Sequence, residues 1–271
     1  MCGIIGAISE ANVAPLLMEG LRRLEYRGYD SAGIATLSCG KVHRRRAEGK
    51  LAELSTLLES EPIKGSIGIG HTRWATHGVA NMTNAHPHAT DRVAVVHNGI
   101  IENFDLLRRE LKESGYAFES ETDTEAIAHC IHKHLTETGE LIAAVQKTVK
   151  ILEGAYAIAV MSVSDPERLV IARQGAPAIV GIGDGENFVA SDVAALLPVT
   201  RNYIILEEGD VAVVDSESVK IYDRDGKETN RLITESELTA DAAERGDFAH
   251  YMQKEIHEQA QAVASTLEER T

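Results

Sequence analysis

Apolar and polar positions alternate with two different periods along the first hundred residues. Residues 2–9 form an apolar run between polar neighbours, which indicates a buried strand. Valine and leucines then recur three and four residues apart up to about Tyr26, which predicts an amphipathic helix. Apolar runs at 34–38 and from Val42 onward predict two further strands joined at a tight Cys-Gly turn.

A long polar loop interrupts this pattern. Residues 65–71 read as a glycine-rich strand, but residues 72–91 show no periodicity and contain Thr, His, Asn and Pro. Residues 93–96 form another apolar run, which leads directly into a His-Asn-Gly sequence. A loop of this length inside a folded domain is usually functional or disordered.

Helices dominate the middle of the chain, and short strands dominate the part that follows. Helices are predicted at 103–114 and 140–152, and a third begins at Thr122, where Glu125 completes a capping box. Strands are then predicted at 155–163, 168–173, 178–183, 187–190, 203–206, 210–215 and 218–223. Most of these strands are too apolar to be half-exposed, so we expect two stacked sheets with helices outside them. The region 249–270 reads as a charged helix or linker.

Composition and charge narrow the range of partners. The 271 residues are 44% hydrophobic and 25% charged, as in a soluble globular protein, and the net charge is −15. An acidic surface repels nucleic acid and anionic lipid, so neither is an expected partner. No segment has the apolar length of a membrane helix, and the N-terminus does not resemble a signal peptide. Three cysteines indicate a reducing compartment, so we expect a cytoplasmic protein.

Cys2 is the residue with the most distinctive chemistry. Removal of Met1 would give it a free α-amino group, whose pKa near 7.7–8.0 lets it act as a base for the thiol. A thiolate that attacks a carbonyl needs donors for the resulting oxyanion, and an Asn side chain beside a Gly amide could supply them. Taken alone, Asn98-Gly99 could equally be an ordinary turn dipeptide, and Cys2 could be an incidental small residue.

Several motifs occur together with this cysteine. They are MCGI at the start, LEYRGYDSAG at 24–33, HTRWATHG at 71–78, HNGIIEN at 97–103, SETDTE at 120–125 and HYMQKEIHEQ at 250–259. This set resembles the class II glutamine amidotransferases, which are N-terminal-nucleophile hydrolases. The spelling is most similar to the glucosamine-6-phosphate synthase family. The resemblance implies an α+β fold, a four-layer α/β/β/α sandwich of two mainly antiparallel sheets.

The resemblance also assigns the central roles. It makes Cys2 the nucleophile, and Asn98 with the Gly99 amide the oxyanion hole. Arg73 would bind the α-carboxylate of glutamine, which suits a planar bidentate donor. Asp123 would bind the α-ammonium, although an acidic residue in the first turn of a helix is also expected for dipole reasons.

Five further residues are implied around this centre. Thr76 and His77 would line the substrate pocket, with His77 not needed as a base. Arg27 and Gly28 would pack against Cys2 and order its amino group. Trp74 lies in the loop that would close over glutamine, and its ring would gate an ammonia passage to a partner domain.

The implied function is hydrolysis of L-glutamine, which supplies ammonia for glucosamine 6-phosphate synthesis from fructose 6-phosphate. We expect an amidotransferase domain at 2–240 and a linker at 241–271 toward sugar-isomerase domains that lie outside this chain. No cofactor or metal is expected, and the full-length enzyme is expected to be a homodimer. Two alternatives stay open: a domain that serves another acceptor, and a non-catalytic module that retains Met1.

Overall fold

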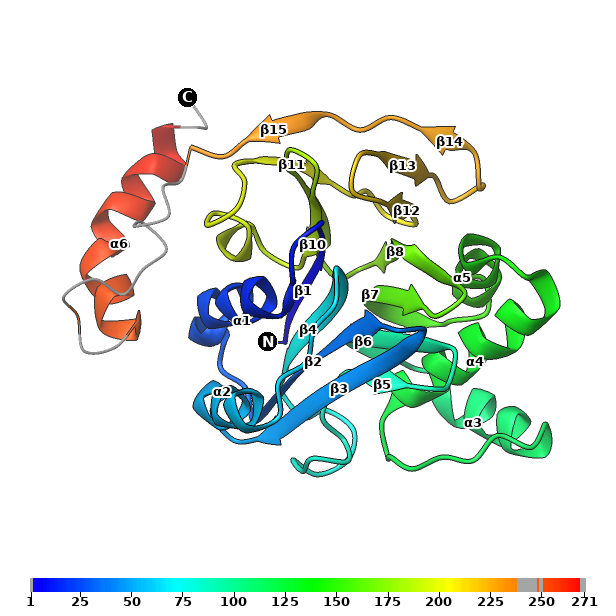
Figure 1. Ribbon diagram of the computed structural model, residues 1–271. Helices are drawn as coiled ribbons and strands as arrows, with labels where there is room; N and C mark the ends of the chain where they lie inside the picture. Colours follow the sequence, from blue (N-terminus) through cyan, green and yellow to red (C-terminus); the bar gives the residue numbers. More distant parts are fainter. Residues whose placement is uncertain (1, 238–247, 249–250, 269–271) are drawn as a thin grey trace. The chain divides into compact units, whose positions relative to one another are not determined.

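Two antiparallel sheets of eight and seven strands lie face to face (Figure 1). The first sheet contains, in spatial order, β15 (Ile233–Glu235), β11 (Asn202–Ile205), β9 (Ile179–Ile182), β10 (Asn187–Ala190), β1 (Gly3–Ile8), β4 (Ile67–Arg73), β2 (Ser31–Ser38) and β3 (Lys41–Glu48). The second contains β14 (Glu228–Thr229), β13 (Val219–Tyr222), β12 (Val211–Val214), β8 (Asp165–Gln174), β7 (Gly154–Ser162), β6 (Val93–Ile101) and β5 (His88–Ala89).

Alternating side chains divide each central strand between two cores. In β1, Ile4 and Ile8 face the second sheet, whereas Ile5 packs against the helices outside. In β6, Val96 faces the first sheet and Val95 faces the opposite helices. Because successive residues of a strand point to opposite faces, an apolar run without alternation has to be covered on both sides.

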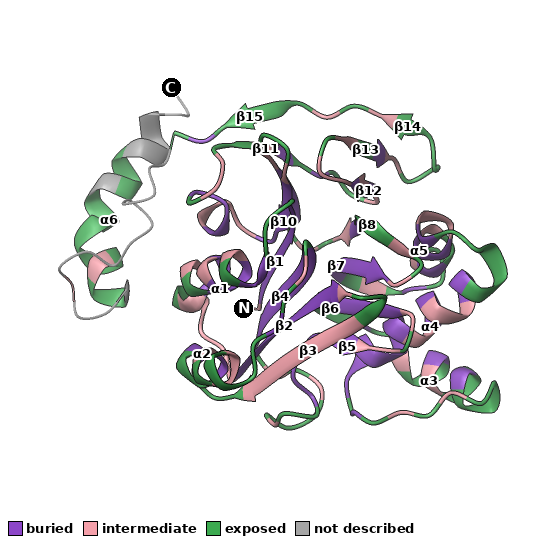
Figure 2. Ribbon diagram, viewed as in Figure 1, coloured by how far each residue is buried: buried purple, intermediate pink, exposed green. Residues whose placement is uncertain are grey.

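Helices supply that cover. The first sheet is covered by α1 (Ala14–Arg23) and α2 (Leu51–Ser60), and the second by α3 (Phe104–Glu113), α4 (Asp123–Thr138) and α5 (Leu141–Val149). Figure 2 shows the central strands buried and β3, at the edge of the first sheet, only partly covered. The predicted four-layer α/β/β/α sandwich is therefore confirmed.

Most predicted elements are present, with informative differences. Thr122 caps α4 as predicted, since its Oγ1 accepts a hydrogen bond from the Glu125 amide at 3.3 Å. The reciprocal half of the capping box is replaced, because the Glu125 carboxylate accepts from the Glu119 and Ser120 amides instead, both at 2.7 Å. Asn98 and Gly99 lie within β6 instead of in a turn, because they pair with Ala157 and Tyr156 of β7. The short strands β14 and β15 carry mostly polar, exposed residues, so the hydrophobic pattern did not predict them.

Strand pairing determines where the site forms. In the first sheet Gly3 of β1 pairs with Thr72 of β4, so Cys2 lies beside the end of β4. The long loop after β4 also approaches β2 closely: a Cβ on Gly33 would lie 2.3 Å from the His86 carbonyl oxygen. The beginning of the chain and the polar loop therefore meet at one end of the sandwich.

The computed structural model describes residues 2–237, 248 and 251–268. The chain forms two compact units, 1–237 and 238–271. The second unit contains α6 (Tyr251–Glu268), which accounts for the charged helix predicted near the end of the chain. Within the described residues, every helix is too short or too polar to cross a membrane.

Candidate active site

A small cavity opens beside Cys2. It is lined by Cys2, Arg73, Trp74, Thr76, His86, His97, Gly99, Thr122, Asp123 and Thr124. Six of the ten residues predicted from the sequence are among them, and they come from four separate segments of the chain. The cavity has a volume of only about 10 Å³, which is room for about one water molecule. The residues of the site therefore lie together, but the space between them is too small for anything larger than a water molecule.

The Cys2 thiol is held by the backbone of the polar loop. The Trp74 amide donates to Cys2 Sγ at 3.2 Å, and the thiol lies 3.6 Å from the Trp74 carbonyl oxygen. Burial raises the pKa of the Cys2 thiol, although the Trp74 amide acts in the opposite direction. The thiol is thus neutral at physiological pH, and a nearby base has to ionise it before it can attack.

Two side chains hold the main chain of Cys2. Arg27 Nη1 and Asn98 Nδ2 each donate to the Cys2 carbonyl oxygen at 3.2 Å. Arg27 is fixed in turn by Asp192, whose Oδ2 lies 2.5 Å from Arg27 Nη2. Ser191 lies beside them, and its Oγ accepts a hydrogen bond from the Ile4 amide at 3.0 Å. Arg27 therefore contacts Cys2 as predicted, but at the carbonyl oxygen instead of the amino group, and Asp192 helps to hold its guanidinium there.

Sequence reasoning missed Asp192 and Ser191. They follow β10, which pairs with β1 and so brings residues about 190 positions apart into contact. Neither residue belongs to a motif with a chemical signature. Only the strand pairing indicates their place beside Cys2.

The Arg73 guanidinium is buried and faces the loop that follows it. It donates to the carbonyl oxygens of His77, Gly78 and Val79, the last two at 3.5 and 3.4 Å. Asp30 Oδ1 lies 3.9 Å from Arg73 Nη1. A carboxylate could replace these neutral acceptors, because charge-assisted bonds to Arg are stronger than neutral ones. The guanidinium could therefore bind an anion, but in this conformation the loop carbonyl oxygens take up its donors.

Asp123 is the first residue of α4, and it lines the cavity. Its Oδ2 accepts a hydrogen bond from the Ile101 amide at 3.0 Å and lies 3.8 Å from His97 Nδ1. The carboxylate is buried, but its second oxygen has no such contact in the described residues. One carboxylate oxygen of Asp123 therefore binds the last residue of β6, and the other can bind a cation.

Gly28 and Trp74 contact each other, and His77 lies apart from the cavity. Gly28 has φ +73°, and a Cβ there would lie 2.8 Å from Trp74 Cζ3. The indole is 55% exposed, so one edge rests on Gly28 while the rest faces solvent. The His77 ring packs on Phe104 at 4.8 Å, and it is its carbonyl oxygen that contacts Arg73. The structure thus places the His77 main chain, and not its ring, at the site.

Residues 71–198 match the family described as a glutamine amidotransferase domain. Glutamine–fructose-6-phosphate aminotransferase (isomerizing) of Shewanella oneidensis is 55% identical over 271 residues, which is 100% of this chain and 44% of that enzyme. The enzyme of the same name from Escherichia coli is 52% identical over 268 residues, 98% of this chain and 44% of its own. A glutamine amidotransferase domain is therefore present in this chain.

Solved structures agree with this assignment. Glutamine phosphoribosylpyrophosphate amidotransferase from B. subtilis superposes on 82% of this chain with a TM-score of 0.70 and 26% identity, over 49% of its own length. A class-II glutamine aminotransferase domain protein from Silicibacter pomeroyi has a TM-score of 0.56 and 14% identity, over 82% of this chain and 99% of that one, and shares the fold. The chain spans about 44% of the length of the curated relatives above.

Buried histidines surround the site of this amidotransferase domain. His86 and His97 line the cavity, and each ring lies within hydrogen-bond distance of Thr124 Oγ1, at 2.6 and 3.0 Å. His88 lies 2.9 Å from Thr122 Oγ1. Burial lowers the pKa of all three rings, to about 3 for His88, so they are uncharged at neutral pH. His86 and His88 therefore contact threonines that line the cavity.

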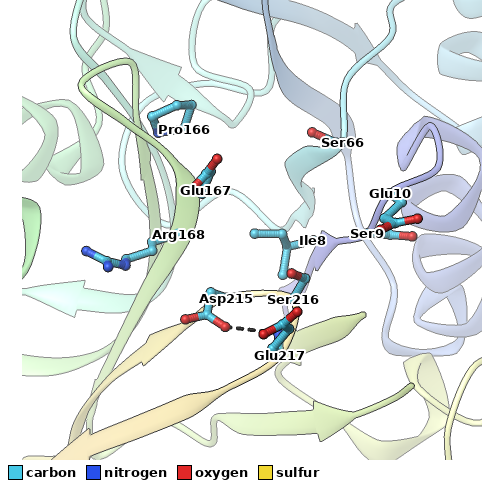
Figure 3. Close-up of a pocket in the computed structure, with 10 residues that line it drawn as sticks. All are labelled: Ile8, Ser9, Glu10, Ser66, Pro166, Glu167, Arg168, Asp215, Ser216 and Glu217. Atoms are coloured by element: carbon cyan, nitrogen blue, oxygen red, sulfur yellow. Dashed lines mark hydrogen bonds between the residues drawn. The ribbon is translucent and has the colours of Figure 1, made fainter. Parts of the chain in front are cut away.

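A larger hollow lies at the opposite end of β1. Its volume is about 640 Å³, and it is lined by Ile8, Ser9, Glu10, Ser66, Pro166, Glu167, Arg168, Asp215, Ser216 and Glu217 (Figure 3). Asp215 accepts hydrogen bonds from the Glu217 and Ser218 amides at 2.9 and 2.6 Å, so it stabilises its own turn. No hydrogen bond among these side chains pairs a nucleophile with a base, so the Cys2 cavity is the better candidate for an active site.

Proposed function

We propose that this domain hydrolyses the side-chain amide of L-glutamine through a γ-glutamyl thioester on Cys2, after Met1 has been removed. One observation carries the proposal. A half-buried thiol shares a cavity with an arginine, an aspartate and a glycine that arrive from separate segments of the fold. The thiol can attack the amide carbon of glutamine, and the glycine amide can bind the oxyanion. The arginine can bind the α-carboxylate, and the aspartate can bind the α-ammonium.

The reaction requires no residue outside this site. The α-amine of Cys2 takes the thiol proton, and the thiolate attacks the amide carbon of glutamine. The oxyanion accepts hydrogen bonds from Asn98 Nδ2 and the Gly99 amide. Collapse of this intermediate breaks the C–N bond, and ammonia leaves with the proton held by the amine. Water then loses a proton to the amine and attacks the thioester, which releases glutamate and restores the thiol.

Glutamine binding has to open the cavity, because about 10 Å³ cannot hold an amino acid. The substrate carboxylate would displace the loop carbonyls from Arg73, and the ammonium would bind the free oxygen of Asp123. Thr76 would line the pocket, as would the main chain at His77. The loop with Trp74 would then close over the substrate, exclude water and protect the thioester.

The relatives suggest where the ammonia goes. They are named glutamine–fructose-6-phosphate aminotransferases, and the present chain matches less than half of each. We therefore assign 2–240 to the amidotransferase domain, and 241–271 to a linker toward sugar-isomerase domains. In the longer enzyme, expected to be a cytoplasmic homodimer, ammonia would pass Trp74 and convert fructose 6-phosphate to glucosamine 6-phosphate.

Glutamate release by protein that begins at Cys2, verified by intact mass, tests this proposal. We expect Cys2→Ala to lower the rate by at least about 10³-fold, since Cys2 supplies the only thiol among the described residues that line the cavity. Protein that retains Met1 should be similarly inactive, because its base is blocked as an amide. Glutamate release by Cys2→Ala at the parent rate would refute the mechanism. An inactive parent with a free Cys2 amine would instead favour a non-catalytic module.

A further inference from the structure

His71 contacts the oxyanion-hole asparagine from the opposite sheet. Its ring lies on β4 of the first sheet and is fully buried. His71 Nε2 lies 3.0 Å from Asn98 Oδ1 and 3.0 Å from the His97 carbonyl oxygen, both on β6 of the second sheet. On its other side, the Asn98 amide nitrogen donates to the Cys2 carbonyl oxygen at 3.2 Å. The asparagine side chain therefore lies between the histidine and the nucleophile.

These contacts determine where the imidazole proton lies. The His97 carbonyl oxygen can only accept, so His71 Nε2 has to carry the hydrogen. The same N–H points at the Asn98 side chain, which has to present its oxygen there. Nδ1 of His71 is buried and has no hydrogen-bond partner among the described residues. A proton at Nδ1 would be unsatisfied, so the ring is the neutral Nε2–H tautomer. Burial also lowers the His71 pKa to about 3, which keeps the ring neutral at physiological pH.

The tautomer in turn orients the Asn98 amide. With the oxygen held by His71, the NH₂ group faces Cys2 and offers two hydrogens. One binds the Cys2 carbonyl oxygen, and the other is available to an oxyanion formed at the thiol. A flipped amide would set its NH₂ against the His71 N–H and turn an oxygen toward the developing negative charge. That arrangement would repel the transition state instead of stabilising it.

The histidine itself has little freedom to move. Its ring stacks on His86 with the centroids 4.3 Å apart and the planes inclined by 31°. His86 Nε2 lies 2.6 Å from Thr124 Oγ1 in α4. The backbone of His71 pairs with Gly33 of β2 and with Ile4 of β1, two residues after Cys2. One ring thus links the sheet that carries the nucleophile to the sheet that carries the oxyanion hole.

We propose that His71 is a positioning residue for glutamine hydrolysis: its Nε2–H fixes the Asn98 amide with the NH₂ group toward Cys2. The proposal deepens the function assigned above and rests on it. It predicts that the histidine contributes to transition-state stabilisation without contacting glutamine. Loss of its hydrogen bond should therefore lower kcat far more than it raises KM.

The test compares His71→Leu and His71→Gln in protein that begins at Cys2. Leucine fills similar space without a donor, so kcat should fall about 10²- to 10³-fold, as when one oxyanion donor is lost, with KM within about threefold. Glutamine carries an N–H at about the reach of Nε2 and should keep kcat within about tenfold of the parent. Alkylation of Cys2 by iodoacetamide forms no oxyanion, so its rate should stay at the parent value in both variants.

The matched control is His134→Leu. His134 is also a buried histidine bound to a threonine, at 2.8 Å from Thr148 Oγ1, but it lies between α4 and α5 away from Cys2. His134→Leu should lower the free energy of unfolding about as much as His71→Leu does, because both bury leucine in place of histidine. It should leave kcat unchanged. If His71→Leu does not unfold cooperatively like the parent, His71→Asn, which is polar but too short to reach Asn98, replaces it with the same expected loss.

A double-mutant cycle identifies the path of the effect. In an Asn98→Ala background, the His71→Leu change should lower kcat by less than about threefold further, because its partner is already gone. Full additivity would overturn the proposal, as would a His71→Leu kcat within threefold of the parent or a His71→Gln kcat as low as that of His71→Leu. If the parent itself lacks Cys2-dependent glutaminase activity, the proposed function fails. An active parent with an unaffected His71→Leu variant refutes the positioning role alone.

Discussion

Gly99→Ala is the substitution whose cost can be worked out most directly from the structure. Gly99 has φ +126°, and a Cβ added to it would lie 2.0 Å from the Ala155 carbonyl oxygen. Ordinary contacts begin near 3.5 Å, so β6 and β7 would have to separate here by about 1.5 Å. The unfavourable φ costs about 1–3 kcal/mol, and the overlap costs about as much again. The Gly99 amide would also move away from the oxyanion.

The expected result has two parts. The free energy of unfolding, measured by urea denaturation, should fall by about 2–6 kcal/mol. In protein that is still folded, kcat for glutamate release should fall at least about 10²-fold, since a displacement of about 1 Å can have that effect. Gly115→Ala is the matched control, because Gly115 has φ +89° and a Cβ there would have nothing within 4 Å. It should lose stability through φ alone and retain full activity.

Equal losses of unfolding free energy in Gly99→Ala and Gly115→Ala would refute this prediction, because the overlap of the new Cβ with the Ala155 carbonyl oxygen would then cost nothing. The prediction is equally refuted if Gly99→Ala keeps kcat within about threefold of the parent. In that case the Gly99 amide would not be part of the oxyanion hole.

Three other predictions concern the surroundings of Cys2. Asp192→Ala should remove the ion pair that holds Arg27. It should lower kcat about tenfold and the free energy of unfolding by about 1.5–3 kcal/mol, the usual contribution of a charge-assisted hydrogen bond; an unchanged kcat in steady-state assays would contradict this. Arg73→Lys should raise the KM for glutamine about tenfold or more by loss of bidentate binding, and an unchanged KM would exclude Arg73 from carboxylate recognition. Stability should decrease as the pH falls from about 6.5 toward 3, because the unfolded chain gains protons that buried His71 and His88 do not take up. Urea unfolding from pH 7 to pH 4 measures this, and His88→Gln should reduce the slope by up to about 1.4 kcal/mol per pH unit.

Local patterns predicted the elements well where one physical rule dominates. Capping chemistry marked the start of α4 at Thr122, and unbroken apolar runs indicated sheets covered on both faces, which the structure confirms. The pattern wrongly placed Asn98 and Gly99 in a turn, because an Asn-Gly pair favours turns unless it is hydrogen-bonded to a neighbouring strand. In the fold β7 does so, and Gly99 accommodates the close approach of the Ala155 carbonyl oxygen.

The sequence motifs marked Cys2, Arg73 and Asp123 as a set through their resemblance to the class II glutamine amidotransferases. They could not show that Asp192 holds Arg27 or that His71 orients Asn98. Those contacts join residues from about 27 to 165 positions apart, and a hydrogen bond over such a separation leaves no trace in local composition. They exist because β10 pairs with β1, and because the two sheets stack closely enough for one imidazole to span them. Residue chemistry therefore follows from the chain itself, whereas orientation, protonation and closure of the site follow from packing.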